Sequence, residues 1–278
     1  GGSGEVSHGR LQPCADAADR ARVAQDRQPD LLHKIIRKHP GTQALFFNFP
    51  GQAFAEQKKP SGDDAEGDNE APTLNNVYLA QLLHELLQKV EYDGEFVTSC
   101  RPFYLVGFGN GGNVATYFAA KFGQRPEYSF TLKSLILANS HAYLDNQLAA
   151  IYHSSLNVFS CFPRDRPDLP VSYFSRFIFS ENYMKRVDKN LVLNIYTAIA
   201  NPITNDGRAD LCRGALEHVD MREAVQDEIS VPLVLIQSTE NSLVNAKHID
   251  TYLEKRRAQH VWAHQQRSGK LSKTVANQ

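Results

Sequence analysis

The chain lacks the features of membrane and secreted proteins. Its 278 residues contain no run of about 18 apolar residues, which a membrane-spanning helix needs. The first residues lack the apolar stretch of a signal peptide. The formal net charge is -1, so no overall field would attract nucleic acid or anionic lipid. We therefore expect no membrane and no nucleic-acid partner.

Closely spaced cysteines and metal-ligand motifs are also missing. The four cysteines contain no C-x-x-C pair, and this spacing favours free thiols in a reducing, intracellular and cytoplasmic compartment, although a secreted protein could still pair them. Association with the cytoskeleton or another large assembly is left open. We expect no metal site, because seven of the histidines show no H-x-x-x-H or H-E-x-x-H spacing among themselves: His33, His39, His84, His141, His153, His218 and His248. The cysteines are Cys14, Cys100, Cys161 and Cys212.

Short apolar runs alternate with amphipathic segments along most of the chain. The runs at 44–49, 103–107, 131–139, 231–236 and 259–263 predict strands, with helices at 15–23, 30–38, 74–90, 113–122 and 246–256. Continuous rather than alternating apolar strands predict a parallel sheet covered on both faces. This is the pattern of an α/β fold.

Composition divides the chain into segments. Residues 142–213 are aromatic-rich and helical without a strand, which predicts a helical cap whose aromatic residues form its core. We expect a linker or cloning scar at 1–4, a first core part at 5–141 with a disordered acidic insertion at 58–72, the cap at 142–213, a second core part at 214–264, and a flexible tail at 265–278.

The segment Gly107-Phe108-Gly109-Asn110-Gly111-Gly112 follows a buried strand and opens a helix. In that setting G-x-centre-x-G is a nucleophile elbow, a tight turn whose flanking glycines avoid collisions and whose central residue carries the attacking group. Here the centre is Gly109, which has no side chain. The same glycines also fit a dinucleotide fingerprint, but the strand is not the first one and Glu127 lies in a loop, so we expect no cofactor.

Four segments in order resemble the α/β-hydrolase superfamily. They are Phe49-Pro50-Gly51-Gln52-Ala53, the elbow and its helix at 103–122, SLILAN at 134–139 and ISVPLVLIQSTENSLV at 229–244. The resemblance implies a mostly parallel sheet flanked by helices, with a helical cap, or lid, inserted between two late strands. The central glycine and the stretch 201–222 are most similar to the N-myc downstream-regulated family, whose members have the hydrolase fold and are regarded as non-enzymatic.

The resemblance also places the catalytic triad. The nucleophile falls on Gly109, and the acid falls on Asn241, beside Glu240, which we expect to point elsewhere. For the base, His260 and His264 lie in the right region, but neither sits in the expected Gly-Gly-His turn. An amide cannot stabilise the imidazolium that general-base catalysis forms. The elbow residues Gly107, Phe108, Gly109, Asn110 and Gly111 are therefore interpreted as vestigial, and we expect no catalysis.

Three hypotheses for function follow. The first is a non-catalytic protein-interaction or scaffold module within a larger intracellular protein, which binds an unidentified protein partner through the acidic insertion or the cap, with a homodimer left open. The second is a receptor for a small apolar ligand in the vestigial pocket. The third is a residual esterase that uses a histidine-activated water.

Overall fold

The computed structural model describes residues 38, 42–50, 72–94, 101–163, 166, 168–190, 192, 194, 203–253, 262–267 and 270–275. The chain forms two compact units, Gly1–Phe47 and Asn48–Gln278. All the strands belong to the second unit, and the description below concerns it. His260, the predicted helix at 15–23, residues 30–37 of the predicted helix at 30–38, and residues 58–71 of the predicted acidic insertion at 58–72 lie outside the described residues.

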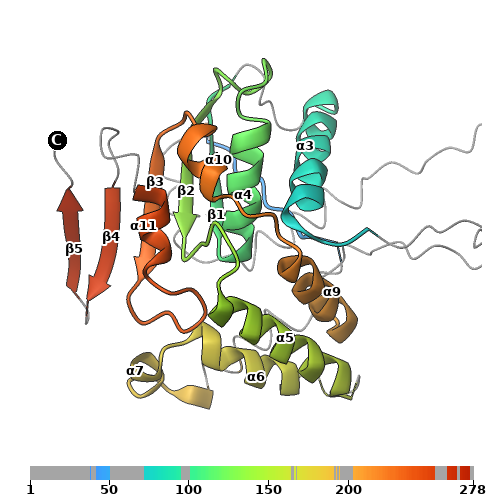
Figure 1. Ribbon diagram of the computed structural model, residues 1–278, viewed down its shortest axis with the longest axis vertical. Helices are drawn as coiled ribbons and strands as arrows, with labels where there is room; N and C mark the ends of the chain where they lie inside the picture. The colour runs from blue at the N-terminus through green and yellow to red at the C-terminus, as the bar shows by residue number, and fades with distance from the viewer. Residues whose placement is uncertain are drawn as a thin grey trace, which may run out of the picture. The chain divides into compact units, whose positions relative to one another are not determined.

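Five strands form one sheet in the order β1-β2-β3-β4-β5 (Figure 1). The strands β1 to β4 are parallel to their neighbours, and β5 is antiparallel to β4. Helices separate the parallel strands along the chain, so the sequence correctly predicts an α/β architecture. The bounds are Phe103–Phe108 (β1), Leu132–Ala138 (β2), Leu233–Ser238 (β3), Trp262–Arg267 (β4) and Lys270–Val275 (β5).

The two faces of this sheet differ in burial. Leu135, Leu137, Leu233 and Leu235 alternate along β2 and β3 with at most 3% of each residue exposed. On the opposite face of β1, large apolar side chains are exposed: Tyr104 to 64% and Phe108 to 67%. The prediction that apolar strands are covered on both faces is therefore wrong for β1, because continuous apolar character indicates a strand without showing what packs on it.

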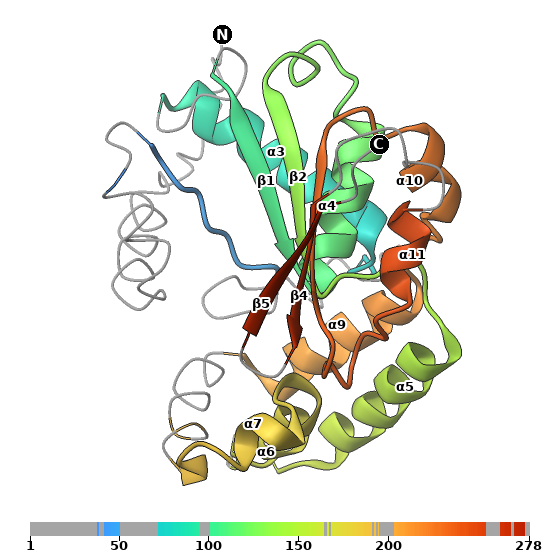
Figure 2. The same cartoon turned by 90° about the vertical axis from the view of Figure 1, so that its left-hand side faces the viewer.

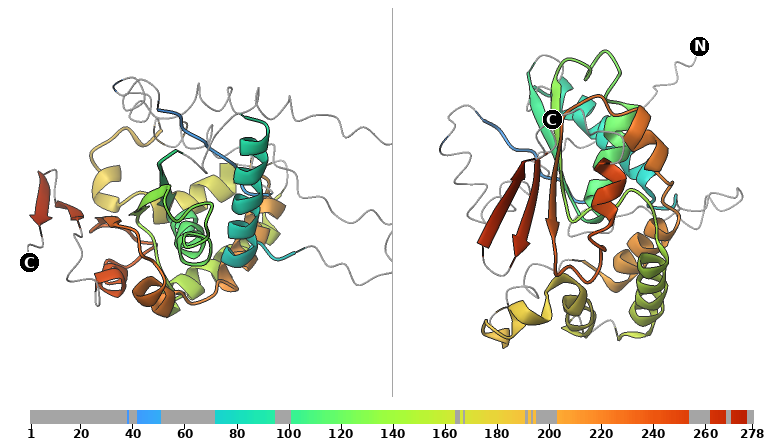
Figure 3. Two further views of the ribbon diagram at one scale, coloured as in Figure 1. Left: turned by 90° about the horizontal axis from the view of Figure 1, so that it is seen from above. Right: turned by 60° about the vertical axis from the view of Figure 1, so that its left-hand side comes forward.

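The described helices α3, α4, α10 and α11 lie on the side of the buried face (Figures 2 and 3). The alanine-rich helix α4 contacts β1 and β2, and α3 packs against α4 through Leu79, Leu83 and Leu87, which recur at helical spacing. Asn75 caps α3 by accepting a hydrogen bond from Tyr78 N–H. The bounds are Asn76–Tyr92 (α3), Asn110–Lys121 (α4), Arg222–Asp227 (α10) and His248–Leu253 (α11).

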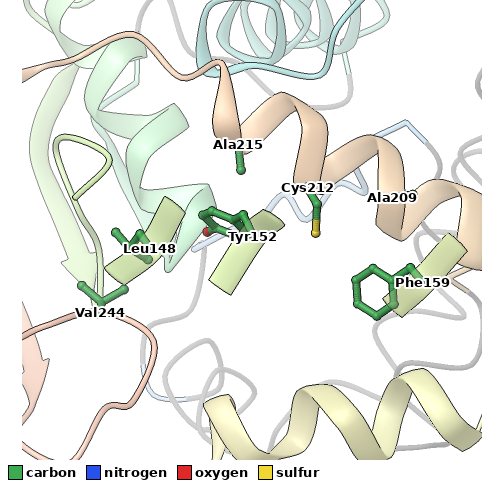
Figure 4. Packing of buried hydrophobic residues seen from close by; sticks show 7 residues of the cluster. All are labelled: Leu148, Tyr152, Phe159, Ala209, Cys212, Ala215 and Val244. Atoms are coloured by element: carbon green, nitrogen blue, oxygen red, sulfur yellow. The ribbon is translucent and has the colours of Figure 1, made fainter. Parts of the chain in front are cut away.

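The cap lies beyond the carboxyl ends of the parallel strands (Figure 1). It contains α5 (Asn146–Cys161), α6 (Asp168–Ile178), α7 (Glu181–Met184) and α9 (Asn205–Leu216). The helices α5 and α9 pack face to face and bury one apolar cluster (Figure 4). Tyr152 and Phe159 belong to this cluster, which confirms that cap aromatics form its core. The other members are Leu148, Ala209, Cys212, Ala215 and Val244.

The strand predicted at 44–49 is not observed. Residues 44–49 were expected to form a strand, yet no strand is assigned there and Phe47 is 38% exposed. A short apolar run predicts burial, but strand formation also needs a neighbouring backbone. The predicted tail at 265–278 overlaps the end of β4 and all of β5, and its flexibility stays a prediction.

Candidate functional site

The glycine-rich turn joins β1 directly to α4. β1 ends at Phe108, and α4 begins at Asn110, so Gly109 alone makes the turn. Its dihedral angles are φ 53° and ψ -120°, in the region of positive φ that L side chains rarely adopt. The Gly109 N–H donates to Ala138 O at the end of β2 over 2.9 Å. The turn therefore has the strained geometry expected of a nucleophile elbow.

Glycine is sterically required at two positions of the elbow. A Cβ at Gly107 would lie 2.4 Å from Gly112 Cα, and a Cβ at Gly112 would lie 2.3 Å from Ser140 Oγ. A Cβ at Gly111 would meet no atom within 4 Å. The prediction of a steric glycine is therefore correct for Gly107 and wrong for Gly111. Gly112 has that role because α4 passes Ser140 closely.

The central position has room for a side chain that it does not carry. A Cβ on Gly109 would meet no atom within 4 Å. The surroundings therefore do not demand glycine here, and only the positive φ favours it. Because nucleophiles at this turn also adopt a strained conformation, the backbone is shaped for a reactive side chain that is absent.

His218, which follows α9, connects the elbow to α3. The backbone N–H of Asn76 donates to His218 Nδ1 over 3.0 Å, and His218 Nε2 lies 2.5 Å from Asn110 Oδ1. Because Nδ1 accepts, the neutral ring holds its proton on Nε2, which donates to Asn110. Burial lowers the pKa of His218 to about 4. Both nitrogens are therefore committed to structural hydrogen bonds, and the ring is neutral at pH 7.

A chain of buried amides extends this network to the end of β2. Asn76 Nδ2 donates to Asn113 Oδ1 over 2.7 Å, and Asn113 Nδ2 donates to the carbonyl oxygen of His141 over 2.8 Å. Both asparagines have no exposed surface. Buried amides that are this well bonded fix the relative positions of the elements they join, here α3, α4 and the loop after β2.

Asn241, which the resemblance places at the position of the triad acid, has a structural role. Asn241 Oδ1 accepts the backbone N–H groups of Leu243 and Val244 over 2.8 and 3.0 Å. This arrangement is an Asx turn that shapes the loop after β3. The neighbouring Glu240 accepts from Ser180 Oγ and Asn182 Nδ2 of the cap over 2.7 and 3.1 Å. The expectation that Glu240 points elsewhere is confirmed.

Neither candidate base stands in the loop after β4. His260 lies outside the described residues. His264 lies within β4, with its Cα paired to Ile236 of β3 and Lys273 of β5. The two residues between β4 and β5 are Ser268 and Gly269. The structure thus places the backbone of His264 inside a strand and not in a loop after it.

Sequence analysis missed an Asp–His pair nearby. Asp145 directly precedes α5, and its Oδ2 atom lies 3.0 Å from His248 Nε2. Its Oδ1 atom accepts a hydrogen bond from Leu148 N–H and so caps α5. His248 is fully buried, and burial lowers its pKa although Asp145 opposes the shift. These residues are far apart in the sequence and form no motif. Their one shared feature is a position next to the ends of the strands.

His141 lies between the other two buried histidines. Its ring centroid is 6.4 Å from that of His218 and 6.2 Å from that of His248. Only 1% of His141 is exposed, and burial lowers its pKa to about 3.

Within the part of the chain that the structure describes, no cluster of three or more histidine, cysteine or acidic residues could hold a metal ion. No helix in that part is long and apolar enough to cross a membrane.

The sequence matches no protein-family model and no curated protein. The structure is similar to many solved structures, three of which are the following enzymes. An esterase from Exiguobacterium antarcticum aligns with a TM-score of 0.53 and 13% identity over 71% of this chain and 68% of the esterase. The enol-lactonase from Burkholderia xenovorans LB400 aligns with a TM-score of 0.53 and 15% identity over 76% of this chain and 70% of the lactonase. MGS-M2, an α/β-hydrolase enzyme from a deep-sea metagenome library, aligns with a TM-score of 0.51 and 19% identity over 73% and 68% of the two chains.

These likenesses agree on the fold. The chain has the α/β-hydrolase fold, with a mostly parallel sheet, flanking helices and a helical cap, as its sequence predicted. At these identities the similarity concerns the fold alone, since one fold hosts many functions.

Proposed function

We propose that this chain is a non-catalytic protein of the α/β-hydrolase fold that acts by binding a protein partner. The observation that carries the proposal is the side-chain-free Gly109 at the centre of an otherwise intact elbow. Covalent hydrolysis at this turn needs an oxygen, sulfur or carboxylate nucleophile. The same glycine suggests kinship with the N-myc downstream-regulated family, whose members are regarded as non-enzymatic.

The groups around the elbow support a structural role for the site. Asn241 replaces the carboxylate that would stabilise a charged imidazole, and its oxygen already accepts two backbone N–H groups. The one adjacent carboxylate, Glu240, is bonded to the cap. Residues that would perform catalysis in an enzyme thus serve here to fasten loops, which favours a rigid binding module.

The described histidines near the elbow also argue against a relocated general base. His218 uses both ring nitrogens in hydrogen bonds, and His248 is buried with its Nε2 on Asp145. A general base must be neutral and must also reach the proton that it removes. Both rings are neutral at pH 7, but neither presents a free nitrogen at an exposed position.

A binding role requires a surface, and the sheet offers one. The exposed apolar side chains Tyr104, Val106 and Phe108 follow one another on the same face of β1, and Ile236 of β3 is 42% exposed. Soluble proteins seldom leave apolar side chains contiguous on a surface unless that surface binds something. The cap also exposes apolar side chains, since Ile178 and Tyr183 are each 46% exposed, but Tyr104 and Phe108 on β1 are more exposed, at 64% and 67%.

Ester hydrolysis tests the proposal. The purified chain is assayed with p-nitrophenyl acetate and butyrate, beside the same chain unfolded in urea. Surface histidines give a slow background that rises linearly with ester concentration and survives unfolding. We expect the folded chain to show only that background. Saturation kinetics that disappear on unfolding would contradict the proposal.

A gain-of-function pair sharpens this assay. Because Gly109 has room for a Cβ, Gly109→Ser places a hydroxyl at the elbow, and adding Asn241→Asp supplies the acid. We expect both variants to remain at background, since no described histidine completes the triad. Activity in Gly109→Ser that is lost on changing His264 would show that the base is present, leaving the missing nucleophile as the only defect.

A further inference from the structure

The three buried histidines occupy the place where the chain crosses between core and cap. His141 lies in the loop through which the chain leaves β2 for α5, and His218 lies in the segment through which it returns from α9. The two crossings are bonded to each other, because Met221 N–H donates to Ala142 O over 2.7 Å. His248 begins the helix that packs beside them. Opening the cap would therefore disturb this cluster.

Protonation would break one of the contacts of His218, although a hydrogen bond with the Gly214 backbone favours the charged ring. Its Nδ1 accepts the backbone N–H of Asn76, and a protonated nitrogen cannot accept a hydrogen bond. A proton on Nδ1 therefore breaks the link between the returning segment and α3. The link to Asn110 at the elbow, made by Nε2, does not replace it.

Protonation is equally unfavourable at His141. Neither of its ring nitrogens has a hydrogen-bond partner among the described residues, and only 1% of the residue is exposed. Its nearest titratable neighbours are two more imidazoles, which would repel a charge. Asp145, the nearest carboxylate, is bonded to His248 and to the first turn of α5. A charged His141 would therefore lack both water and an acceptor.

The charged groups around the cluster do not reverse this balance. Asp145 favours a proton on His248, while burial and the nearby Lys247 oppose it. Arg222 lies 4.6 Å from the Tyr143 ring and pairs with Asp220, so that charge is neutralised locally. Burial outweighs Asp145 and the pKa of His248 is lowered as well, but only His141 and His218 lack a neighbouring carboxylate bonded to the ring.

We propose that His141, His218 and His248 form an acid-sensitive latch that holds the cap to the core. With all three rings neutral, both crossings stay closed. When acid protonates the rings, the crossings open and the cap helices α5 and α9 lose their packing before the sheet and α4 unfold. The Asp145–His248 pair fixes the start of α5 within the same latch.

The size of the effect follows from the difference in proton affinity between the closed and open states. In the open state each histidine has its ordinary pKa of about 6.5, whereas the pKa is about 3 for His141 and about 4 for His218 in the closed state. Acidification from pH 7.5 to 5.0 therefore multiplies the opening equilibrium by about 30 for each of the two rings. The latch is closed above pH 6.5 and weakens as pH falls below it.

Hydrogen exchange measured by mass spectrometry tests the latch in the full chain. Amides of α5 and α9 are compared with those of β2 and α4 at pH 7.5 and 5.0, after correction for the intrinsic exchange rate. We expect exchange in α5 and α9 to accelerate at least 30-fold relative to β2 and α4. Unchanged protection in α5 and α9, or equal loss in all four elements, would overturn the proposal.

Variants separate the latch from a general effect of acid. His141→Leu replaces an unpartnered ring with an apolar side chain of similar size, and we expect it to reduce the acceleration about 30-fold. His218→Asn keeps an acceptor on its side chain without a titrating ring and is expected to act in the same direction. The control is His153→Gln, an exposed position on α5, which should respond like wild type. Equal responses in all variants would contradict the assignment.

Discussion

The close approach of β1 and α4 predicts that two glycines four residues apart have opposite tolerance to alanine. In Gly107→Ala, the new Cβ would lie 2.4 Å from Gly112 Cα and 2.7 Å from Gly111 O. Carbon atoms prefer a separation of about 3.5–4.0 Å, so the backbone of α4 must move by more than about 1 Å. That backbone is held by a hydrogen bond from Gly112 N–H to Gly109 O and by the packing of α4 on β1 and β2.

Gly107→Ala therefore should cost about 3 kcal/mol or more of unfolding free energy, the upper part of the range for overpacked cores. Gly111→Ala is the matched control, because its Cβ meets no atom within 4 Å. At this helical position alanine should stabilise by up to about 1 kcal/mol. Urea unfolding followed by circular dichroism measures both values. Equal losses in the two variants, or a Gly107→Ala within about 0.5 kcal/mol of wild type, would refute the close-approach argument.

Three further predictions concern Ser140, Asn241 and the buried histidines. Gly112→Ala should destabilise the fold, because the new Cβ would collide with the side chain of Ser140. Adding Ser140→Gly removes both clashing atoms and should recover most of the lost unfolding free energy, measured by urea unfolding. No recovery would mean that the backbone itself is the obstacle. Asn241→Ala should lower the unfolding free energy by about 1–2 kcal/mol, because it removes the acceptor of two N–H groups, whereas Asn241→Asp should stay within about 0.5 kcal/mol of wild type. A reversed order of the two variants would refute the Asx-turn role. Burial lowers the pKa of His141 to about 3, so on acidification the unfolded state binds a proton at this residue before the folded state does. The contribution of His141 to the unfolding free energy is therefore full above pH 6.5 and falls by about 2 kcal/mol at pH 5.0. A pH-independent unfolding midpoint between pH 7.5 and 5.0 would contradict this prediction.

The features predictable from sequence are those encoded locally. The strand at 103–108 and the helix after it follow from an apolar run, a glycine cluster and an amphipathic segment, each within a few residues. The same local pattern places Gly109 at the elbow centre, where the structure finds the strained turn. Asn241 follows β3 directly, so its place in the loop is also visible in the sequence.

The remaining features depend on contacts between distant residues. Gly112 is sterically required only because Ser140 comes from another strand end. His141, His218 and His248 meet because three separate connections end at the same place, and no spacing rule connects them. The segment at 44–49 has the composition of a strand, yet pairing depends on neighbours that composition does not specify.

Covalent labelling with a fluorophosphonate ester tests most directly the claim that the elbow has no nucleophile. The folded chain is incubated with excess reagent, and its intact mass is measured, with a serine esterase as the positive control. The account predicts an unmodified mass for the wild-type chain, since Gly109 offers no atom to attack phosphorus. A stoichiometric adduct on one residue, formed by the folded chain and absent after unfolding in urea, would contradict it and would locate an active nucleophile elsewhere in the molecule.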